Sequence, residues 1–357
     1  MKGYNMFNWE SNVRRVDPYV PGEQPKEDNI IKLNTNENPY PPSPNVKMDD
    51  VDISLFRKYP DPTAGMLVKT IAEYHGVNED QVFVGVGSDD VLAMSFMTFF
   101  NSEKPILFPD ITYSFYPVWA EEFRIPYKAV PLNDDFRIVK EDYYTENGGI
   151  VFPNPNAPTG IEESLSFVRD ILDHNRDSVV IVDEAYIDFG GESALSLIPE
   201  YDNLLVTRTF SKSRSMAGLR IGYAIGNAEM IKFLSDVKYS FNSYTMNMPS
   251  IILGVKSIED DKYFRETVEK IKATREWFTE ELRKRDFHVL PSSSNFVFAE
   301  HKELSGRGIF EAAKKKGIYM RHFNAPRIQN FLRITIGTDE EMRSVIEFLD
   351  EFFKISA

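Results

Sequence analysis

Cysteine is absent from the 357 residues of the sequence. This absence excludes a disulfide scaffold, thiolate catalysis and cysteine-ligated metal sites. Basic residues are outnumbered, with 41 Lys and Arg against 55 Asp and Glu, and the formal net charge of −14 argues against nucleic acid as the main partner. The five histidines, at 75, 174, 288, 301 and 322, lack the spacing of metal ligands, so we expect no metal site.

Long apolar runs are also missing. No stretch of about 18 apolar residues is present that could span a membrane. The first residues, MKGYNMFNWESNVRR, lack the apolar core of a signal peptide. We therefore expect a cytoplasmic protein without a membrane partner.

Apolar runs of strand length alternate with helical patterns from about residue 65. Such alternation predicts an α/β fold with a mostly parallel central sheet between helices. The length favours two domains, although one large α/β domain is the alternative. We predict an N-terminal arm over 1–45 that packs on the small domain, a large domain over 46–257 and a smaller α/β domain over 258–357.

Polar residues follow several of the predicted strands. Asp183 comes directly after the apolar run 179–182, and Lys212 follows the run 204–206. In a parallel sheet the chemistry gathers just past the carboxyl ends of strands. Taken alone, Asp183 is as well explained by a loop start or helix cap, and Lys212 by a solvated surface charge.

A glycine-rich turn, VGVGSDD, leads into a predicted helix from Asp89 to Phe100. The backbone N–H groups of such a helix start suit a phosphate, although the turn matches neither a dinucleotide fingerprint nor a P-loop. Together with Lys212 and Asp183, it meets the needs of pyridoxal phosphate. That cofactor requires a lysine for a Schiff base, a carboxylate at the ring nitrogen and an anchor for its phosphate.

Six motifs, in this order, resemble fold-type-I aminotransferases that use pyridoxal phosphate, and within them the histidinol-phosphate aminotransferase family. The resemblance covers nearly the whole chain. The motifs are KLNTNENP (32–39), RKYPDPT (57–63), NAPTG (156–160), VDEAYIDF (182–189), TFSKSRSMAGLRIGY (209–223) and FLRITIGT (331–338).

The resemblance assigns catalytic roles to three residues. Lys212 corresponds to the lysine that forms the internal aldimine and then moves a proton between substrate and cofactor. Asp183 corresponds to the carboxylate that holds the ring nitrogen protonated. Tyr186 corresponds to the tyrosine that donates to the phenolic oxygen of the cofactor.

Cofactor contacts are implied in the same way. Tyr113 corresponds to the aromatic residue stacked on the ring, and Tyr59 to a tyrosine that reaches the cofactor phosphate of the neighbouring subunit, which implies a homodimer. The sequence departs from the family at Ala157, where an asparagine usually donates to the phenolic oxygen. Asn156 or Asn154 takes over that task, or Tyr186 acts alone. The implied phosphate cradle consists of Ser88, Asp89, Thr209, Ser211 and Arg220.

Two arginines, Arg321 and Arg333, correspond to residues that bind the anionic groups of the substrates. They would hold the phosphate of histidinol phosphate in one half-reaction and the carboxylates of glutamate or 2-oxoglutarate in the other. Tyr19 corresponds to a tyrosine that closes over the substrate, and Asn36 and Asn295 match family positions near the pocket.

The resemblance therefore implies a pyridoxal-phosphate-dependent transamination of L-histidinol phosphate with 2-oxoglutarate, a ping-pong reaction of histidine biosynthesis. An aromatic amino-acid aminotransferase and a threonine-phosphate decarboxylase carry much the same motifs and stay open as alternatives. A binding protein that has lost its activity is disfavoured, because Lys212, Asp183, Tyr186 and Arg220 are all present.

Overall fold

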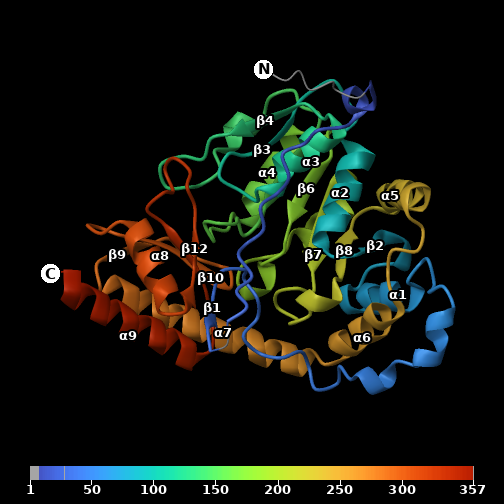
Figure 1. Ribbon diagram of the computed structural model, residues 1–357. Helices are drawn as coiled ribbons and strands as arrows, with labels where there is room; N and C mark the ends of the chain where they lie inside the picture. Colours follow the sequence, from blue (N-terminus) through green and yellow to red (C-terminus); the bar gives the residue numbers. More distant parts are fainter. Residues whose placement is uncertain (1–7, 28, 357) are drawn as a thin grey trace.

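The computed structural model describes residues 8–27 and 29–356 (Figure 1). Residues 1–7 and 28 of the predicted N-terminal arm, and residue 357 of the predicted small domain, lie outside the described residues. No helix within the described part of the chain is long and apolar enough to cross a membrane.

The main sheet of the described residues has seven strands in the order β2-β8-β7-β6-β5-β3-β4. Strand β8 is antiparallel to both of its neighbours, and the other pairs are parallel. The predicted α/β class with a mostly parallel central sheet is thus confirmed. The strands are β2 (Val82–Gly85), β3 (Ile106–Pro109), β4 (Tyr127–Val130), β5 (Ile150–Pro153), β6 (Val180–Asp183), β7 (Leu204–Thr209) and β8 (Gly222–Ile225).

Helices cover both faces of this sheet. On one face α2, α3 and α5 pack against the strands, and on the other α1, α4 and α6 do so. Alternate residues of one strand serve the two faces: Leu204 and Val206 belong to one apolar cluster and Leu205 to the other. The helices are α1 (Gly65–His75), α2 (Ser88–Phe99), α3 (Phe115–Phe123), α4 (Leu165–His174), α5 (Ala228–Phe241) and α6 (Met248–Glu259).

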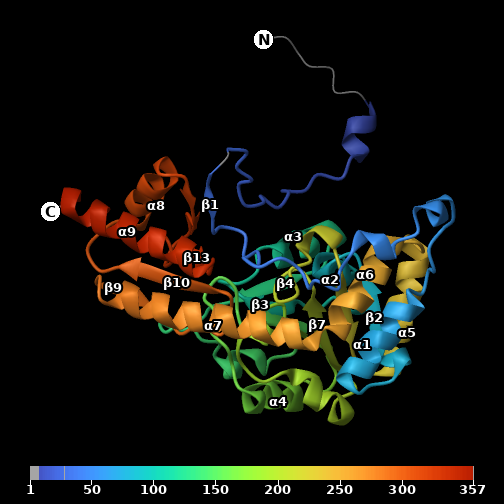
Figure 2. The same ribbon diagram turned by 90° about the horizontal axis from the view of Figure 1, so that it is seen from below.

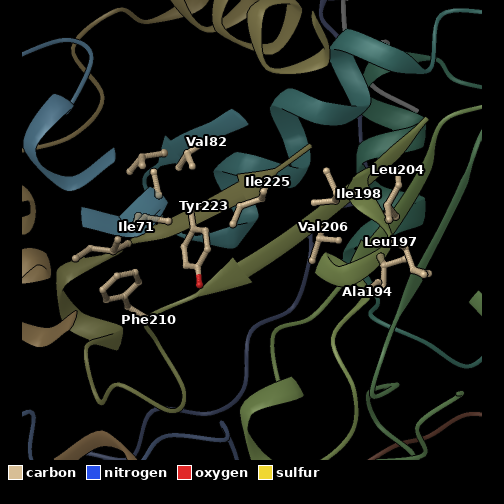
Figure 3. Packing of buried hydrophobic residues seen from close by; sticks show 14 of the residues in the cluster. Ile71, Val82, Ala194, Leu197, Ile198, Leu204, Val206, Phe210, Tyr223 and Ile225 are labelled. Carbon is tan, nitrogen blue, oxygen red and sulfur yellow. The ribbon is translucent and has the colours of Figure 1, made fainter. Parts of the chain in front are cut away.

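Figure 3 shows part of the cluster on the α1 face, where Val206 of β7 and Tyr223 and Ile225 of β8 belong to one cluster and Ile71 of α1 lies on the side of Tyr223. The central strands are buried on both faces, which explains why their sequences are continuous apolar runs rather than alternating ones. The same burial leaves polar side chains only at the strand ends.

A second, four-stranded antiparallel sheet has the order β12-β13-β10-β9. The long helix α7 runs from beside α6 to this sheet (Figures 1 and 2). Its N-cap residue is Asp260, whose side chain accepts from the backbone N–H of Tyr263. The elements are β9 (Phe287–Val289), β10 (Phe296–His301), β12 (Arg321–His322), β13 (Leu332–Thr335), α7 (Asp261–Arg283), α8 (Gly306–Lys315) and α9 (Asp339–Ser356).

The N-terminal segment connects the two sheets across the surface. Near its start, Arg14 Nη1 lies 3.4 Å from Glu122 Oε1 of α3. Further on, β1 (Ile31–Lys32) pairs in parallel with β11 (Ile318–Tyr319) beside the small sheet (Figure 2). Short 3₁₀ turns complete the described chain at Asn8–Asn12, Met48–Asp50, Ile53–Arg57, Glu79–Gln81, Lys140–Tyr143, Ile187–Phe189, Ala194–Glu200 and Ala217–Leu219.

Candidate functional site

A cavity of about 110 Å³ lies at the carboxyl ends of β2, β5, β6 and β7. Because β8 runs the other way, the residues that precede it reach the same edge of the sheet. Most of the residues predicted to hold the cofactor line this one cavity. Its lining consists of Ser88, Asp89, Tyr113, Pro153, Ala157, Asp183, Ala185, Tyr186, Thr209, Ser211, Lys212 and Arg220.

One end of the cavity has the features of an anion cradle. Helix α2 begins at Ser88, so its free backbone N–H groups point into this region. The guanidinium of Arg220 lies across Gly87 so closely that a Cβ there would be 2.5 Å from Arg220 Nη2, and a Cβ on Gly222 would be 2.3 Å from the backbone nitrogen of Ser88. Arg220 Nη1 is 3.5 Å from the hydroxyl of Ser211. The cradle therefore depends on glycine at both positions and suits a phosphate.

The side chain of Asp89, which was expected to contact the phosphate, interacts instead with Tyr113 and Arg220. Its carboxylate accepts from the Tyr113 hydroxyl at 2.7 Å and lies 3.3 Å from Arg220 Nη2. Burial, with the nearby Asp89 charge, raises the pKa of Tyr113 well above its usual range. The Asp89 side chain thus orients the aromatic ring and the arginine, and only its backbone N–H could donate to a phosphate.

Asp183, the last residue of β6, is a buried carboxylate. Its Oδ2 accepts from the Tyr116 hydroxyl at 3.0 Å, and its Oδ1 accepts from the backbone nitrogen of Ala185 at 3.2 Å and from Thr207 at 3.4 Å. Burial raises the pKa of Asp183 to about 6 despite these donors. Sequence reasoning missed Tyr116, because nothing in the run ITYSFY indicates which of its aromatic residues faces β6.

Lys212 is partly buried and is held by the segment 35–38. Its Nζ donates to the Thr35 carbonyl at 3.2 Å, and its own carbonyl accepts from Asn38 Nδ2 at 3.0 Å. Its Nζ also lies 5.8 Å from the centre of the Tyr186 ring. The structure thus places the predicted nucleophilic amine inside the cavity that Asp183 also lines.

The structure places Asn156 outside the cavity, contrary to the expectation that it contacts the cofactor. Its Oδ1 accepts from Thr112 at 3.0 Å, and its Nδ2 donates to the Ile111 carbonyl and to Thr159, each at 3.0 Å. The side-chain oxygen and both side-chain N–H groups of Asn156 are therefore occupied. They stabilise the turn that holds the buried Ala157 against the cavity.

Asn154 does not replace the missing asparagine either. Its Nδ2 donates to the Glu163 carbonyl and its Oδ1 accepts from the Glu163 backbone nitrogen. Of the three alternatives left open by the sequence, the geometry favours Tyr186 as the donor at this side of the cavity. The Tyr186 hydroxyl itself accepts from Asn36 Nδ2 at 2.9 Å.

The two predicted substrate arginines lie side by side. Arg321 on β12 and Arg333 on β13 are partners in register. Arg333 Nη2 donates to the Asn34 carbonyl at 2.9 Å, whereas its Nε has no partner among the described residues. Burial and the neighbouring Arg321 lower the pKa of Arg333. Two adjacent cations, one with an unused donor, form a site that an anion would stabilise.

Arg333 of this pair lies close to the cavity, because its guanidinium is 5.5 Å from the centre of the Phe296 ring, and the Phe296 ring contacts Tyr186 of the cavity lining with ring centres 5.1 Å apart. Tyr19 of the N-terminal segment stacks on Phe115 with ring centres 4.2 Å apart. The cofactor cavity and the cation pair are therefore neighbouring parts of one site.

The other predicted residues are placed as follows. Asn36 and Asn295 are both buried, and Asn295 Nδ2 donates to the Asn36 carbonyl at 3.0 Å. Asn36 does not line the cavity; its Nδ2 donates to the Tyr186 hydroxyl and its Oδ1 accepts from the Thr335 hydroxyl. Tyr59 is 80% exposed and stacks on Tyr244, away from the cavity of its own chain. The described residues contain no group of three or more His, Asp or Glu that could hold a metal ion.

Comparison with known proteins agrees with this geometry. A model of the family described as aminotransferase class I and II matches residues 28–349. Histidinol-phosphate aminotransferase from Lactococcus lactis subsp. cremoris is 52% identical over 350 residues, 98% of both chains, and that from Clostridium beijerinckii is 52% identical over 343 residues, 96% of both. The crystal structure of histidinol-phosphate aminotransferase from Sinorhizobium meliloti in complex with pyridoxal-5'-phosphate shares the fold, with a TM-score of 0.82, 22% identity and 92% of each chain covered. The chain belongs to the class I and II aminotransferases.

Proposed function

We propose that the protein transfers the amino group of L-histidinol phosphate to 2-oxoglutarate with pyridoxal 5'-phosphate as cofactor, in two half-reactions. The observation that carries this proposal is the single cavity lined by Lys212, Asp183 and Arg220, with the arginine pair beside it. The relatives that carry the name histidinol-phosphate aminotransferase support it, because they match along nearly the full chain.

The residues present fit the cofactor. The cradle of Arg220, Ser211 and the α2 start has no room for added side chains at its glycines and offers donors to a phosphate. When bound, pyridoxal phosphate supplies an electron-accepting ring. Asp183 would hold a proton at the ring nitrogen. Lys212 would hold the cofactor through its Nζ and, once the substrate amine has displaced it, its free amine would move the proton of the substrate carbon.

Arg321 and Arg333 explain how one pocket can serve two different substrates. Histidinol phosphate carries a phosphate and no carboxylate, whereas 2-oxoglutarate carries two carboxylates. A guanidinium donates two parallel hydrogen bonds to either group. The Nε of Arg333 is buried and has no partner among the described residues, so this guanidinium keeps an unused donor. The arginine pair thus recognises the anion shared by both half-reactions, and the pocket around it selects the amine.

The direct test compares kcat/KM for L-histidinol phosphate, phenylalanine and threonine phosphate as amine donors. We expect histidinol phosphate to be preferred by at least 100-fold, since a site that pairs its polar groups with one substrate leaves some of them unpaired with another. A preference for phenylalanine would indicate an aromatic aminotransferase. Release of carbon dioxide from threonine phosphate would indicate a decarboxylase.

We also propose that the enzyme is a homodimer in which Tyr59 reaches the cofactor phosphate of the partner. Support comes from exposed apolar residues close in sequence to Tyr59 and to its stacking partner Tyr244: Ile53, Phe56 and Phe241 have 72, 52 and 68% of their surface exposed. Exposed apolar side chains of this size are expected where a partner subunit covers them.

We further propose the division into an N-terminal arm over 1–45, a large domain over 46–257 and a small domain over 258–357. The pairing of β1 with β11 supports the docking of the arm on the small domain. The cytoplasmic location stays a prediction.

A further inference from the structure

We propose that Asn36 is a positioning residue that turns the hydroxyl hydrogen of Tyr186 toward the cofactor cavity, where Ala157 offers no donor. The inference rests on the proposed function, since it concerns how the chain holds the phenolic oxygen of the cofactor. It assigns to Asn36 a role through Tyr186 in place of the substrate contact expected from the sequence.

The contact between the two residues fixes the direction of the hydroxyl. Asn36 Nδ2 donates to Tyr186 Oη at 2.9 Å, and both side chains are buried, with 1 and 9% of their surface exposed. A phenol keeps its O–H bond near the plane of the ring, so the hydrogen has two favoured positions. The hydrogen must avoid the side from which the Asn36 N–H approaches Oη. The Tyr186 hydrogen therefore takes the other side, and it has no acceptor among the described residues.

The orientation of the Asn36 amide follows from its own partners. The Asn36 backbone N–H donates to the Thr335 hydroxyl at 3.0 Å, so that hydroxyl must point its hydrogen elsewhere. The hydrogen goes to Asn36 Oδ1, also at 3.0 Å. Oδ1 is thus committed to Thr335, and the NH₂ group must face Tyr186.

The backbone around Asn36 is equally constrained. Its φ of 55° lies in the left-handed region, which asparagine tolerates better than most residues. On either side of it, the Asn34 carbonyl accepts from Arg333 and the Thr35 carbonyl accepts from Lys212, and Asn38 donates to the Lys212 carbonyl. The segment 34–38 therefore contacts Arg333, Lys212 and Tyr186 at once.

The orientation of the Tyr186 hydroxyl matters because the side of the cavity next to Ala157 offers no other donor from residues 154–157. The Ala157 side chain is a methyl group against the cavity, and Asn156 and Asn154 are engaged in their own turn. Tyr186 is then the hydroxyl that meets the cofactor oxygen there. A hydroxyl that accepts one hydrogen bond also donates a stronger one, so Asn36 both aims and strengthens the Tyr186 donor.

The test measures the pH midpoint of the change in visible absorption of the cofactor bound to the enzyme, with no amine substrate present. A hydrogen bond donated to the phenolic oxygen stabilises its negative charge, so losing that bond raises the midpoint. We expect Asn36→Ala to raise it on the order of 0.5–1 pH unit. Asn36→Asp keeps the shape but offers only acceptors, so Tyr186 would donate to the new carboxylate and the midpoint would rise further.

Two matched variants separate this role from a general structural one. In a Tyr186→Phe background, Asn36→Ala should leave the midpoint unchanged, because the tyrosine through which it acts is gone. Ala157→Asn adds a donor and should lower the midpoint again in the Asn36→Ala protein. An equal shift with and without Tyr186, or no shift at all, would overturn the inference. A wild-type protein that gains no visible band with pyridoxal phosphate would overturn the proposed function as well.

Discussion

The buried Asp183 carboxylate should make the cofactor-free wild-type protein less stable to unfolding than the Asp183→Asn variant. Its pKa is raised to about 6 from an ordinary value of 3.8, because burial disfavours the charged form more than Tyr116 and Ala185 restore it. Asp183→Asn removes the charge and keeps the shape. We therefore expect this variant to unfold at a higher denaturant concentration than the wild type when both lack cofactor.

The magnitude follows from the two pKa values. Between pH 3.8 and about 6 the folded state binds more protons at Asp183 than the unfolded state. The contribution of this group to the free energy of unfolding therefore falls as the pH rises through that window. Above it the full cost is present, and about 2 pH units correspond to on the order of 3 kcal/mol. At pH 5 the cost is roughly half as large.

The assay is urea unfolding of the two cofactor-free proteins at pH 5 and pH 8. The free energy of unfolding of Asp183→Asn should exceed that of the wild type at both pH values, by more at pH 8. Added pyridoxal phosphate should favour the wild type, since binding to the folded state alone stabilises it. A variant no more stable than the wild type at pH 8, or a difference that does not change with pH, would refute the reasoning.

Three further predictions concern residues around the cavity. Tyr116→Phe removes a charge-assisted hydrogen bond to Asp183 worth about 1.5–3 kcal/mol. It should therefore raise the pKa of Asp183 further and move the acidic limb of the pH profile of kcat/KM to higher pH. An acidic limb that does not move would contradict this role of Tyr116. Gly222→Ala should displace the α2 start, because its Cβ would lie 2.3 Å from the Ser88 nitrogen, and weaken cofactor binding at least 10-fold, as measured by fluorescence titration. Mixing inactive Tyr59→Phe chains with inactive Lys212→Ala chains should restore activity in hybrid dimers, and no recovery would argue against a shared site.

The α/β class was predictable because the central strands are buried on both faces, and their apolar runs end at polar residues. This pattern singled out Asp183 and Lys212 as candidates, and the resemblance to the aminotransferases assigned their roles. Strand β4 (Tyr127–Val130) was not predicted, because it lies at the sheet edge and is largely exposed. Helix α3 was not predicted either, because apolar and aromatic residues fill most of its positions, so the buried residues Tyr116, Trp119 and Ala120 do not stand out in the sequence.

The hydrogen bonds that orient the side chains of the site could not be predicted from the sequence for another reason. The Asn36–Tyr186 hydrogen bond joins residues 150 positions apart, and no spacing in the sequence signals it. The expected role of Asn156 came from its place beside Ala157 in the motif. That expectation did not account for its three partners in the turn, which orient the amide away from the cavity.

The most direct test of the account is borohydride reduction of the enzyme with bound pyridoxal phosphate, followed by mass spectrometry of its peptides. The account predicts one cofactor adduct per chain, on Lys212, and none in the Lys212→Ala variant. An adduct on another lysine, or a reducible adduct that persists in Lys212→Ala, would contradict the claim that this cavity binds the cofactor through Lys212.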